Sequence, residues 1–319
     1  MKPLNNILYY IIYSLFYVLS LLPLGVLYVF SDFMYLVVYK LVGYRIKVVR
    51  NNISSSFPDI NDEERLRIER EFYHWFCDYF FETLKMLTMS QEEMLRHIEY
   101  HGVEAVEDCF DRGQDCAAIL GHYGNWEYLS ATPLALKRHP DAPVGLIYHP
   151  LYNKTFDQLF IDIRQSKKGV CIPKQQILRF LVTYRREKRN SLFGYIADQG
   201  PKWENIHLWL PFLGHETPVF TGAERIMRKM HNAVFYVDME RLARGRYRCT
   251  FKPISDDAAN EEPFAITRRF FALLELSIRR DPQCYLWTHN RWKRTREEFE
   301  RRFEIKDGKV VPRKTTTPA

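Results

Sequence analysis

The feature that most constrains this chain is an uncharged run near its N-terminus. From Pro3 to Ser31, about 29 residues, no side chain is an ionisable acid or base apart from tyrosines. A run of this length is long enough to cross the hydrocarbon core of a bilayer. It also lacks the small-residue cleavage site of a secretory signal peptide, because it ends in bulky apolar residues. We therefore predict a membrane segment that stays attached to the chain.

Pro23 and Gly25 interrupt the run, and two membrane arrangements are compatible with such a break. The segment is either one kinked span, or a shorter span followed by an interfacial helix over residues 33–41. A buried hairpin of core helices is the third arrangement, although a soluble core helix seldom needs so long an uncharged stretch.

The charges around the run predict its orientation. Only Lys2 and the amino terminus precede it, and four cations follow it, namely Lys40, Arg45, Lys47 and Arg50. By the positive-inside tendency, the bulk of the chain then lies in the cytoplasm. The formal charge of the whole chain is +7, which indicates an anionic partner such as nucleic acid, a phospholipid surface or an acidic carrier protein.

Beyond Arg50 the composition becomes that of a globular domain. With 46% hydrophobic and 15% aromatic residues, the 319-residue chain has enough apolar side chains for a substantial core. We divide it into a membrane anchor over residues 1–50, a globular domain over 51–311 and a loose tail over 312–319. The six cysteines form neither a CxxC pair nor a dense disulfide spacing, which favours a reducing compartment.

Alternating patterns in the globular region predict its fold class. A long helix is expected over residues 63–87, with an aromatic stripe that packs in the core or partly faces lipid. Short apolar runs predict buried strands at 117–120, 144–148, 192–197 and 233–237. Helices are predicted at 126–137, 154–168, 174–186, 221–230 and 262–280. Strands that alternate with helices predict an α/β fold whose sheet is covered on both faces.

The segment Gly121-His122-Tyr123-Gly124-Asn125-Trp126-Glu127 carries the clearest chemical signal. It follows a predicted strand, so His122 should lie at the carboxyl edge of the sheet, where open α/β folds bind ligands. Glu127, five residues later, is placed to hydrogen-bond the imidazole across a turn at Gly124. The pair would act as a general base and its orienting partner, with a substrate hydroxyl as nucleophile. The alternative is a buried histidine capped by a local carboxylate.

Five further matches in order along the chain carry a resemblance to a known family. They are the uncharged N-terminal span, the connector 52–58, residues 148–151 with Arg164 downstream, residues 197–201 and residues 287–293. Together with the His-x4-Glu segment, they resemble the late lipid A acyltransferase family, the lauroyl and myristoyl transferases of lipopolysaccharide assembly. The resemblance covers almost the whole chain.

The resemblance implies a fold, a reaction and a location. The fold is an α/β sandwich of the glycerophosphate acyltransferase type, with a mostly parallel central sheet flanked by helices and an N-terminal membrane helix. The donor is an acyl thioester of acyl carrier protein or coenzyme A, used as a co-substrate with no other cofactor. The acceptor is a hydroxyl of a lipid A precursor, and the enzyme works at the cytoplasmic face of a bacterial inner membrane.

The resemblance makes the globular domain over residues 51–311 the catalytic domain. It also implies roles for individual residues of that domain. It makes His122 the general base and Glu127 its partner, with Asn125 lining the same turn and binding substrate. Arg164 would bind an anionic part of a substrate, and the alternative for Arg164 is a solvated face of a predicted helix.

Asp198 and Gln199 are the remaining candidates for substrate binding. They follow a predicted strand and enter a Gly-Pro turn, so they should emerge at the same carboxyl edge of the sheet as His122. A polar turn is ordinary at such a place, but a turn from a second strand end can complete a site.

The remaining histidines and the basic residues bear on metal binding and on the kind of partner. The remaining histidines are scattered without HExxH or paired metal spacing, so we predict no metal. A basic cluster could attract lipid phosphates or an acidic carrier, and it consists of Arg268, Arg269, Arg279, Arg280, Arg291, Lys293, Arg294 and Arg296. Nothing matches an RNA-binding or zinc-finger signature, so nucleic acid is not the expected partner.

Three classes of function are therefore compared. The first is acyl transfer to a lipid, with a glycerolipid or an aminolipid as the nearest rival to a lipid A acceptor. The second is a membrane-bound thioesterase, in which the same histidine activates water. The third is a non-catalytic membrane adaptor whose basic surface binds anionic lipid or a partner protein.

Overall fold

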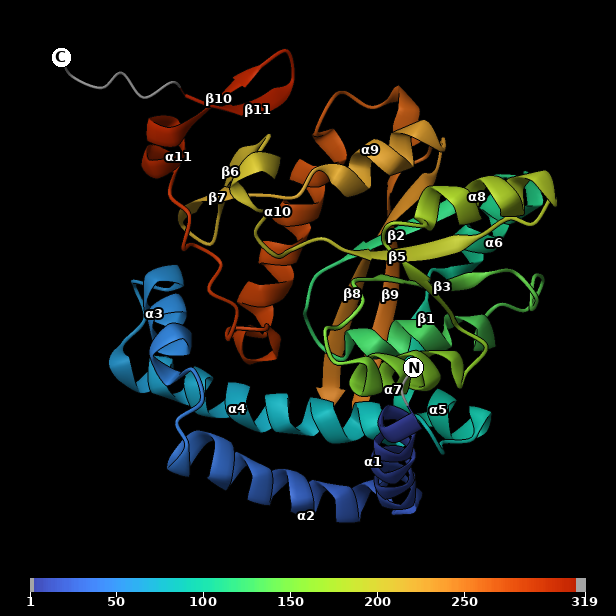
Figure 1. Ribbon diagram of the computed structural model, residues 1–319, viewed down its shortest axis with the longest axis vertical. Helices are drawn as coiled ribbons and strands as arrows, with labels where there is room; N and C mark the ends of the chain where they lie inside the picture. The colour runs from blue at the N-terminus through green and yellow to red at the C-terminus, as the bar shows by residue number, and fades with distance from the viewer. Residues whose placement is uncertain (1–2, 314–319) are drawn as a thin grey trace.

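A seven-stranded mixed sheet forms the centre of the molecule. The computed structural model describes residues 3–313, and its sheet has the strand order β1-β9-β8-β2-β5-β3-β4 (Figure 1). The strands are β1 (Ile98–His101), β2 (Cys116–Leu120), β3 (Val144–Tyr148), β4 (Val170–Pro173), β5 (Leu192–Ile196), β8 (Ala233–Ala243) and β9 (Arg246–Ser255). The five strands from β8 to β4 are parallel, whereas β9 runs antiparallel to β8 and pairs in parallel with β1.

Helices flank this sheet, which confirms the predicted α/β class with a mostly parallel sheet. They are α3 (Ile46–Ser56), α4 (Asp62–Lys85), α5 (Gln91–His97), α6 (Val103–Asp111), α7 (Lys154–Gln165), α8 (Ile177–Arg186), α9 (Gly222–Lys229), α10 (Ala265–Arg280) and α11 (Arg296–Arg302). Two small hairpins lie outside the main sheet, β6 (Trp209–Phe212) with β7 (His215–Pro218), and β10 (Phe303–Lys306) with β11 (Lys309–Pro312). All four predicted strands and the long predicted helix are present.

One predicted helix differs in type. The segment expected to form a helix over 126–137 is a run of 3-10 turns, Trp126–Leu134. Pro133 inside it lacks an N–H, and the hydroxyls of Ser130 and Thr132 each donate to a backbone carbonyl three residues earlier, at 2.7 Å. These side-chain bonds compete with the i→i−4 pattern of an α-helix.

The uncharged N-terminal run folds as two helices with a break at Pro23. They are α1 (Pro3–Leu21) and α2 (Leu24–Tyr35), and α2 continues as a π-helical segment, Leu36–Leu41. In the part of the chain that the structure describes, one helical segment, Leu24–Leu41, is long and apolar enough to cross a membrane. The break agrees with the interruption seen in the sequence.

One face of α2 is attached to the globular domain. The helix lies along α4 (Figure 1), where the Ser31 hydroxyl donates to Asp78 at 2.7 Å and Arg244 donates to Asp32 at 2.6 Å. The other face is apolar and exposed, since Val29 and Phe33 are 68% and 65% exposed. One face of α2 is therefore packed on the globular domain, and its other face is an unusually apolar exposed surface.

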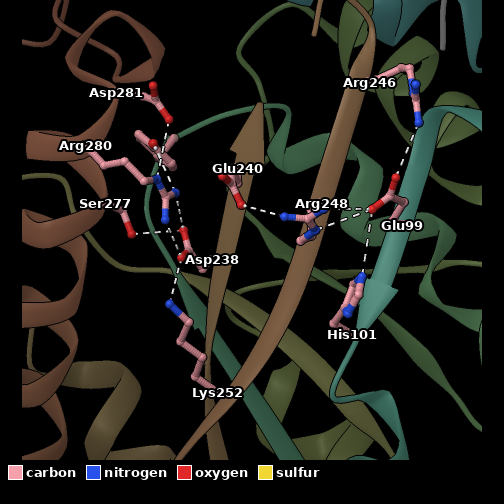
Figure 2. Close-up of polar contacts among 11 residues, drawn as sticks. Glu99, His101, Asp238, Glu240, Arg246, Arg248, Lys252, Ser277, Arg280 and Asp281 are labelled. Atoms are coloured by element: carbon pink, nitrogen blue, oxygen red, sulfur yellow. Dashed lines mark hydrogen bonds and ion pairs between the residues drawn. The ribbon is translucent and has the colours of Figure 1, made fainter. Parts of the chain in front are cut away.

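A buried aspartate ties α10 to the β8–β9 hairpin. Figure 2 shows Asp238 of β8 between Lys252, Arg280 and Ser277, which donate to its carboxylate at 2.8, 2.9 and 2.9 Å. Burial alone raises the pKa of the Asp238 carboxyl, but Arg280 and Lys252 more than offset it and lower the pKa. The charged form is therefore the one that holds these elements together.

Candidate active site

The register of two neighbouring strands brings His122 and Asp198 together. Strands β2 and β5 are adjacent and parallel, and Leu120 pairs with Ile196 at their carboxyl ends. Each of the two polar residues lies two positions beyond one member of this pair. The predicted meeting of the two strand ends at one edge of the sheet is therefore present in the structure.

The loop that carries His122 is held in a fixed shape by the chain near Tyr285. The backbone N–H of Gly124 donates to the carbonyl of Cys284 at 2.9 Å, and Leu286 N–H donates to the carbonyl of His122 at 3.0 Å. Gly124 has φ +59°, and a Cβ there would lie 2.3 Å from the carbonyl oxygen of Met239. Only glycine meets both requirements, because any side chain would clash with backbone.

Asp198 is the hydrogen-bonding partner of the His122 imidazole. Its Oδ1 lies 2.6 Å from His122 Nδ1, and its Oδ2 accepts from Arg291 Nη2 at 3.0 Å. Asp198 and Arg291 are both buried. Burial by itself raises the pKa of the Asp198 carboxyl, but the charges of His122 and Arg291 outweigh it and hold the pKa well below its usual range. An ionised carboxylate therefore orients the imidazole.

This arrangement corrects the expectation that Glu127 hydrogen-bonds His122. Among the described residues, the hydrogen-bonding partners of the imidazole nitrogens are Asp198 and Gln199, and Glu127 is not one of them. The Glu127 carboxylate instead accepts two bonds from Arg164, at 2.6 and 2.7 Å. A buried carboxylate gains more from a charged, two-pronged donor than from a neutral imidazole, which explains the difference.

The Glu127–Arg164 ion pair is nevertheless part of the site. Burial raises the pKa of the Glu127 carboxyl, but Arg164 more than offsets burial and lowers the pKa, with a smaller contribution from the nearby His122. The Tyr79 hydroxyl also donates to Glu127, at 3.2 Å. Arg164 was expected to bind an anionic part of a substrate, yet its guanidinium is already paired with a protein carboxylate.

Asn125 and Gln199, the two amides expected to bind substrate, lie in different surroundings. Asn125 is fully buried, and its amide donates to Glu82 at 2.9 Å. It is not among the described residues that line the cavity, so its placement supports a structural role. Gln199 does line the cavity, and its Nε2 lies 3.4 Å from His122 Nε2.

A cavity of about 800 Å³ opens beside the His122 imidazole. Glu127, Arg164 and Gln199 form polar parts of its lining, and Trp126 lies edge-on to the imidazole with ring centroids 5.0 Å apart. The rest of the lining is largely apolar and includes Leu146, Ile147, Ile177, Tyr195, Phe220 and Ile226. An imidazole at one point of a large, mostly apolar cavity suits a substrate with a long hydrocarbon chain.

Two residues of this site were not assigned to it from the sequence. Tyr79 belongs to the aromatic stripe of α4, which helical spacing identifies only as a packing face. Arg291 was assigned to a basic cluster that could attract lipid phosphates or an acidic carrier, but the structure buries it against Asp198. The segment 287–293 that carries the family resemblance contains Arg291 but gives it no role, and no local pattern marks Tyr79, because both residues contact partners far away in the sequence.

Fold and site together describe an α/β protein with a hydrogen-bonded His122–Asp198 pair beside a mostly apolar cavity, joined to an apolar N-terminal helix. The family model of the bacterial lipid A biosynthesis acyltransferases matches residues 2–294. The chain therefore belongs to this family and is an acyltransferase. No individual protein of curated function matches it significantly.

Among the described residues, no group of three or more His, Cys, Asp or Glu side chains is placed to hold a metal ion.

Proposed function

We propose that this acyltransferase moves a fatty acyl chain from an acyl thioester onto a hydroxyl of a lipid A precursor, with His122 as the general base. The observation that carries the proposal is the hydrogen bond between His122 Nδ1 and the ionised Asp198 carboxylate. That bond fixes the proton on Nδ1 and leaves Nε2 as the basic nitrogen, beside Gln199 at the cavity.

The reaction follows from this tautomer. Nε2 of His122 removes the proton from the acceptor hydroxyl while the hydroxyl oxygen attacks the thioester carbonyl carbon. The tetrahedral intermediate then collapses, its carbon–sulfur bond breaks, and the leaving thiolate takes the proton from the imidazolium. Asp198 stabilises the imidazolium during the interval. No covalent link between acyl group and protein is needed.

The buried ion pair contributes charge to the same step. The Arg164 guanidinium lines the cavity, so its positive charge stabilises the oxyanion that develops on the thioester carbonyl. Glu127 holds the guanidinium in place through two hydrogen bonds. In this proposal Glu127 is a positioning residue for Arg164.

We place the enzyme at the bacterial inner membrane, with the globular domain on the cytoplasmic side. The exposed apolar face of α1 and α2 supports this, together with the cations that follow it. α1 packs against α7, where Tyr9 donates to Asp162 at 2.5 Å, and α7 also carries Arg164. A lipid acceptor at the membrane surface would therefore lie close to the cavity.

The experiment is a reconstituted reaction. Purified protein is incubated with a long-chain acyl thioester and a lipid A precursor, and the lipids are measured by mass spectrometry. We expect a product heavier by one acyl group, formed only when both substrates are present. Release of free fatty acid without acceptor would instead identify a thioesterase, and a product on added glycerolipid or aminolipid alone would reassign the acceptor.

A further inference from the structure

A second cavity, of about 520 Å³, lies on the other side of helix α9 from the catalytic one. Arg225 on α9 lines both cavities, so the two are neighbours separated by this helix. Arg228, Glu224 and His207 also line the second cavity, and Phe264 and Ile305 supply apolar surface. The proposed reaction does not use any of these residues.

Two arginines beside this second cavity have no protein partner among the described residues. Among the described residues, neither Arg225 nor Arg228 takes part in an ion pair or a side-chain hydrogen bond. Glu224 is buried, and its Oε2 accepts from the N–H and the hydroxyl of Thr267 at 2.8 and 2.6 Å. Its Oε1 is buried without any hydrogen-bond partner. Two free guanidiniums and an unsatisfied acceptor suit a ligand with both an anionic group and hydrogen-bond donors.

The position of the second cavity separates it from the membrane. Figure 1 shows α9 and the β10–β11 hairpin at one end of the longest axis of the molecule, and α1 and α2 at the opposite end. A lipid acceptor is held at the bilayer, next to α1 and α2. A ligand of the second cavity must therefore reach the protein from the aqueous side.

We propose that the second cavity binds the phosphate of a 4′-phosphopantetheine arm, with Arg225 and Arg228 as its ligands. This inference rests on the proposed function, because it concerns the donor of the acyl group. The thioester end of the arm lies at His122, the arm passes α9 beside Arg225, and its amides provide donors for Glu224. Acyl carrier protein and coenzyme A both present this phosphate, so the chemistry is shared by the two donors.

A binding experiment tests the site without turnover. The probes are 4′-phosphopantetheine and pantetheine, titrated calorimetrically into the His122→Ala protein. We expect phosphopantetheine to bind at least ten-fold more tightly than pantetheine, and the difference to disappear when Arg225→Gln and Arg228→Gln are combined. The matched control is Lys229→Gln, an exposed cation on the same helix that does not line the cavity. Equal affinity for the two probes, or equal binding by the double variant and the control, would overturn the proposal.

Kinetics on the His122-containing protein identify the source of the phosphate. The KM is measured with acyl carrier protein thioester, with acyl-coenzyme A and with acyl-pantetheine, which has no phosphate. The double variant should raise the KM of both phosphate-bearing donors at least ten-fold more than that of acyl-pantetheine, and the donor that has the lower KM with the unsubstituted protein is the source of the phosphate. A similar rise for all three would contradict a phosphate site. Because the calorimetry does not depend on turnover, a failure of the phosphate site is distinguishable from a failure of acyl transfer itself.

Discussion

Asp198 is the hydrogen-bonding partner of His122, a place that the sequence predicted for Glu127. The sequence predicts a local pair, because a histidine and a carboxylate five residues apart easily meet across a turn. In the structure the partner comes instead from the neighbouring strand, at 2.6 Å from Nδ1, and is itself held by the buried Arg291. The imidazole is thus oriented by contacts between distant parts of the chain, and in the proposed mechanism Asp198 and Arg291 are positioning residues for it.

Replacing Asp198 by asparagine tests the orientation of the imidazole. An amide of the same shape can donate to Nδ1, which would favour the tautomer with the proton on Nε2 and remove the base. We expect kcat to fall by about 10³-fold with little change in KM, because the acceptor still binds but is not deprotonated. Steady-state kinetics measure the effect, and Asp141→Asn in an exposed loop is the control. A fall of less than ten-fold would remove Asp198 from the mechanism.

A double-mutant cycle separates the structural from the catalytic contribution of Glu127 and Arg164. Glu127→Gln and Arg164→Gln each leave one buried charge unpaired, so each should lower the free energy of unfolding by about 3–5 kcal/mol. The double variant should regain much of that loss, because both charges are gone. It should remain poorly active, since the positive charge near the carbonyl is missing. Denaturation and activity measurements on the four proteins check this, and full activity of the double variant would contradict the proposed role.

At the scale of elements, the sequence predicted the sheet better than the site. The apolar runs at residues 117–120 and 192–197 are strands β2 and β5, and the rule that ligands bind at carboxyl ends of strands correctly placed His122 and Asp198 at one edge. Strand order and register are not local properties, so the sequence did not show that these strands are neighbours. The contact between His122 and Asp198 depends on that pairing.

Burial of polar residues was equally hard to predict. Asn125 follows the glycine turn and was expected to line the site, but its amide is buried against Glu82 of α4. Arg291 was assigned to a basic cluster that could attract lipid phosphates or an acidic carrier, but it is buried against Asp198. In both cases the environment is created by an element distant in sequence, and residue type alone carries no information about it.

The exposed face of α2 leads to a test of membrane attachment. Val29 and Phe33 lie one helical turn apart on its apolar face, so glutamates at both positions would place charge where apolar side chains now lie. Binding to anionic vesicles, measured by cosedimentation, should weaken at least ten-fold. Leu276→Glu on α10 is the matched control, because Leu276 is 65% exposed but lies on another element. Unchanged vesicle binding would show that this face is not in contact with lipid.

At the scale of the whole molecule, buried carboxylates set the dependence of stability on pH. Asp198, Glu127 and Asp238 all have a pKa lowered in the folded state. Such groups stabilise the fold fully above their unfolded pKa of about 3.9 to 4.3, and the stabilisation is lost as the pH falls through the lower folded pKa. We therefore expect the melting temperature to drop steeply below about pH 4.

Asp238→Asn should reduce both the stability near neutral pH and its dependence on acid. The variant leaves Lys252 and Arg280 without their shared carboxylate (Figure 2), at a cost of about 2–4 kcal/mol. Since one titrating group is gone, the drop in melting temperature between pH 6 and pH 3 should be smaller than in the wild type. Calorimetry at a series of pH values measures both effects, and an unchanged slope would show that Asp238 does not titrate on unfolding.

The two ends of the molecule differ in character, which bears on the two substrates that we propose. An apolar surface on α1 and α2 lies at one end, the α9 region lies at the other, and residues of both α7 and α9 line the cavity beside His122. In the function that we propose, this arrangement lets a membrane lipid and an acyl thioester approach His122 from opposite sides. In the proposed mechanism, acyl transfer requires the His122 imidazole to take the proton from the acceptor hydroxyl.

The most direct test of that central claim is the rate of acyl transfer by His122→Ala. The protein is first shown to be folded by its melting temperature, and the acylated lipid is then followed by mass spectrometry in a single-turnover reaction with saturating thioester and acceptor. The account predicts a rate at least 10³-fold below that of the wild type, because the variant lacks the imidazole that Asp198 orients beside Gln199 at the cavity. A folded variant that transfers the acyl chain within ten-fold of the wild-type rate would contradict it.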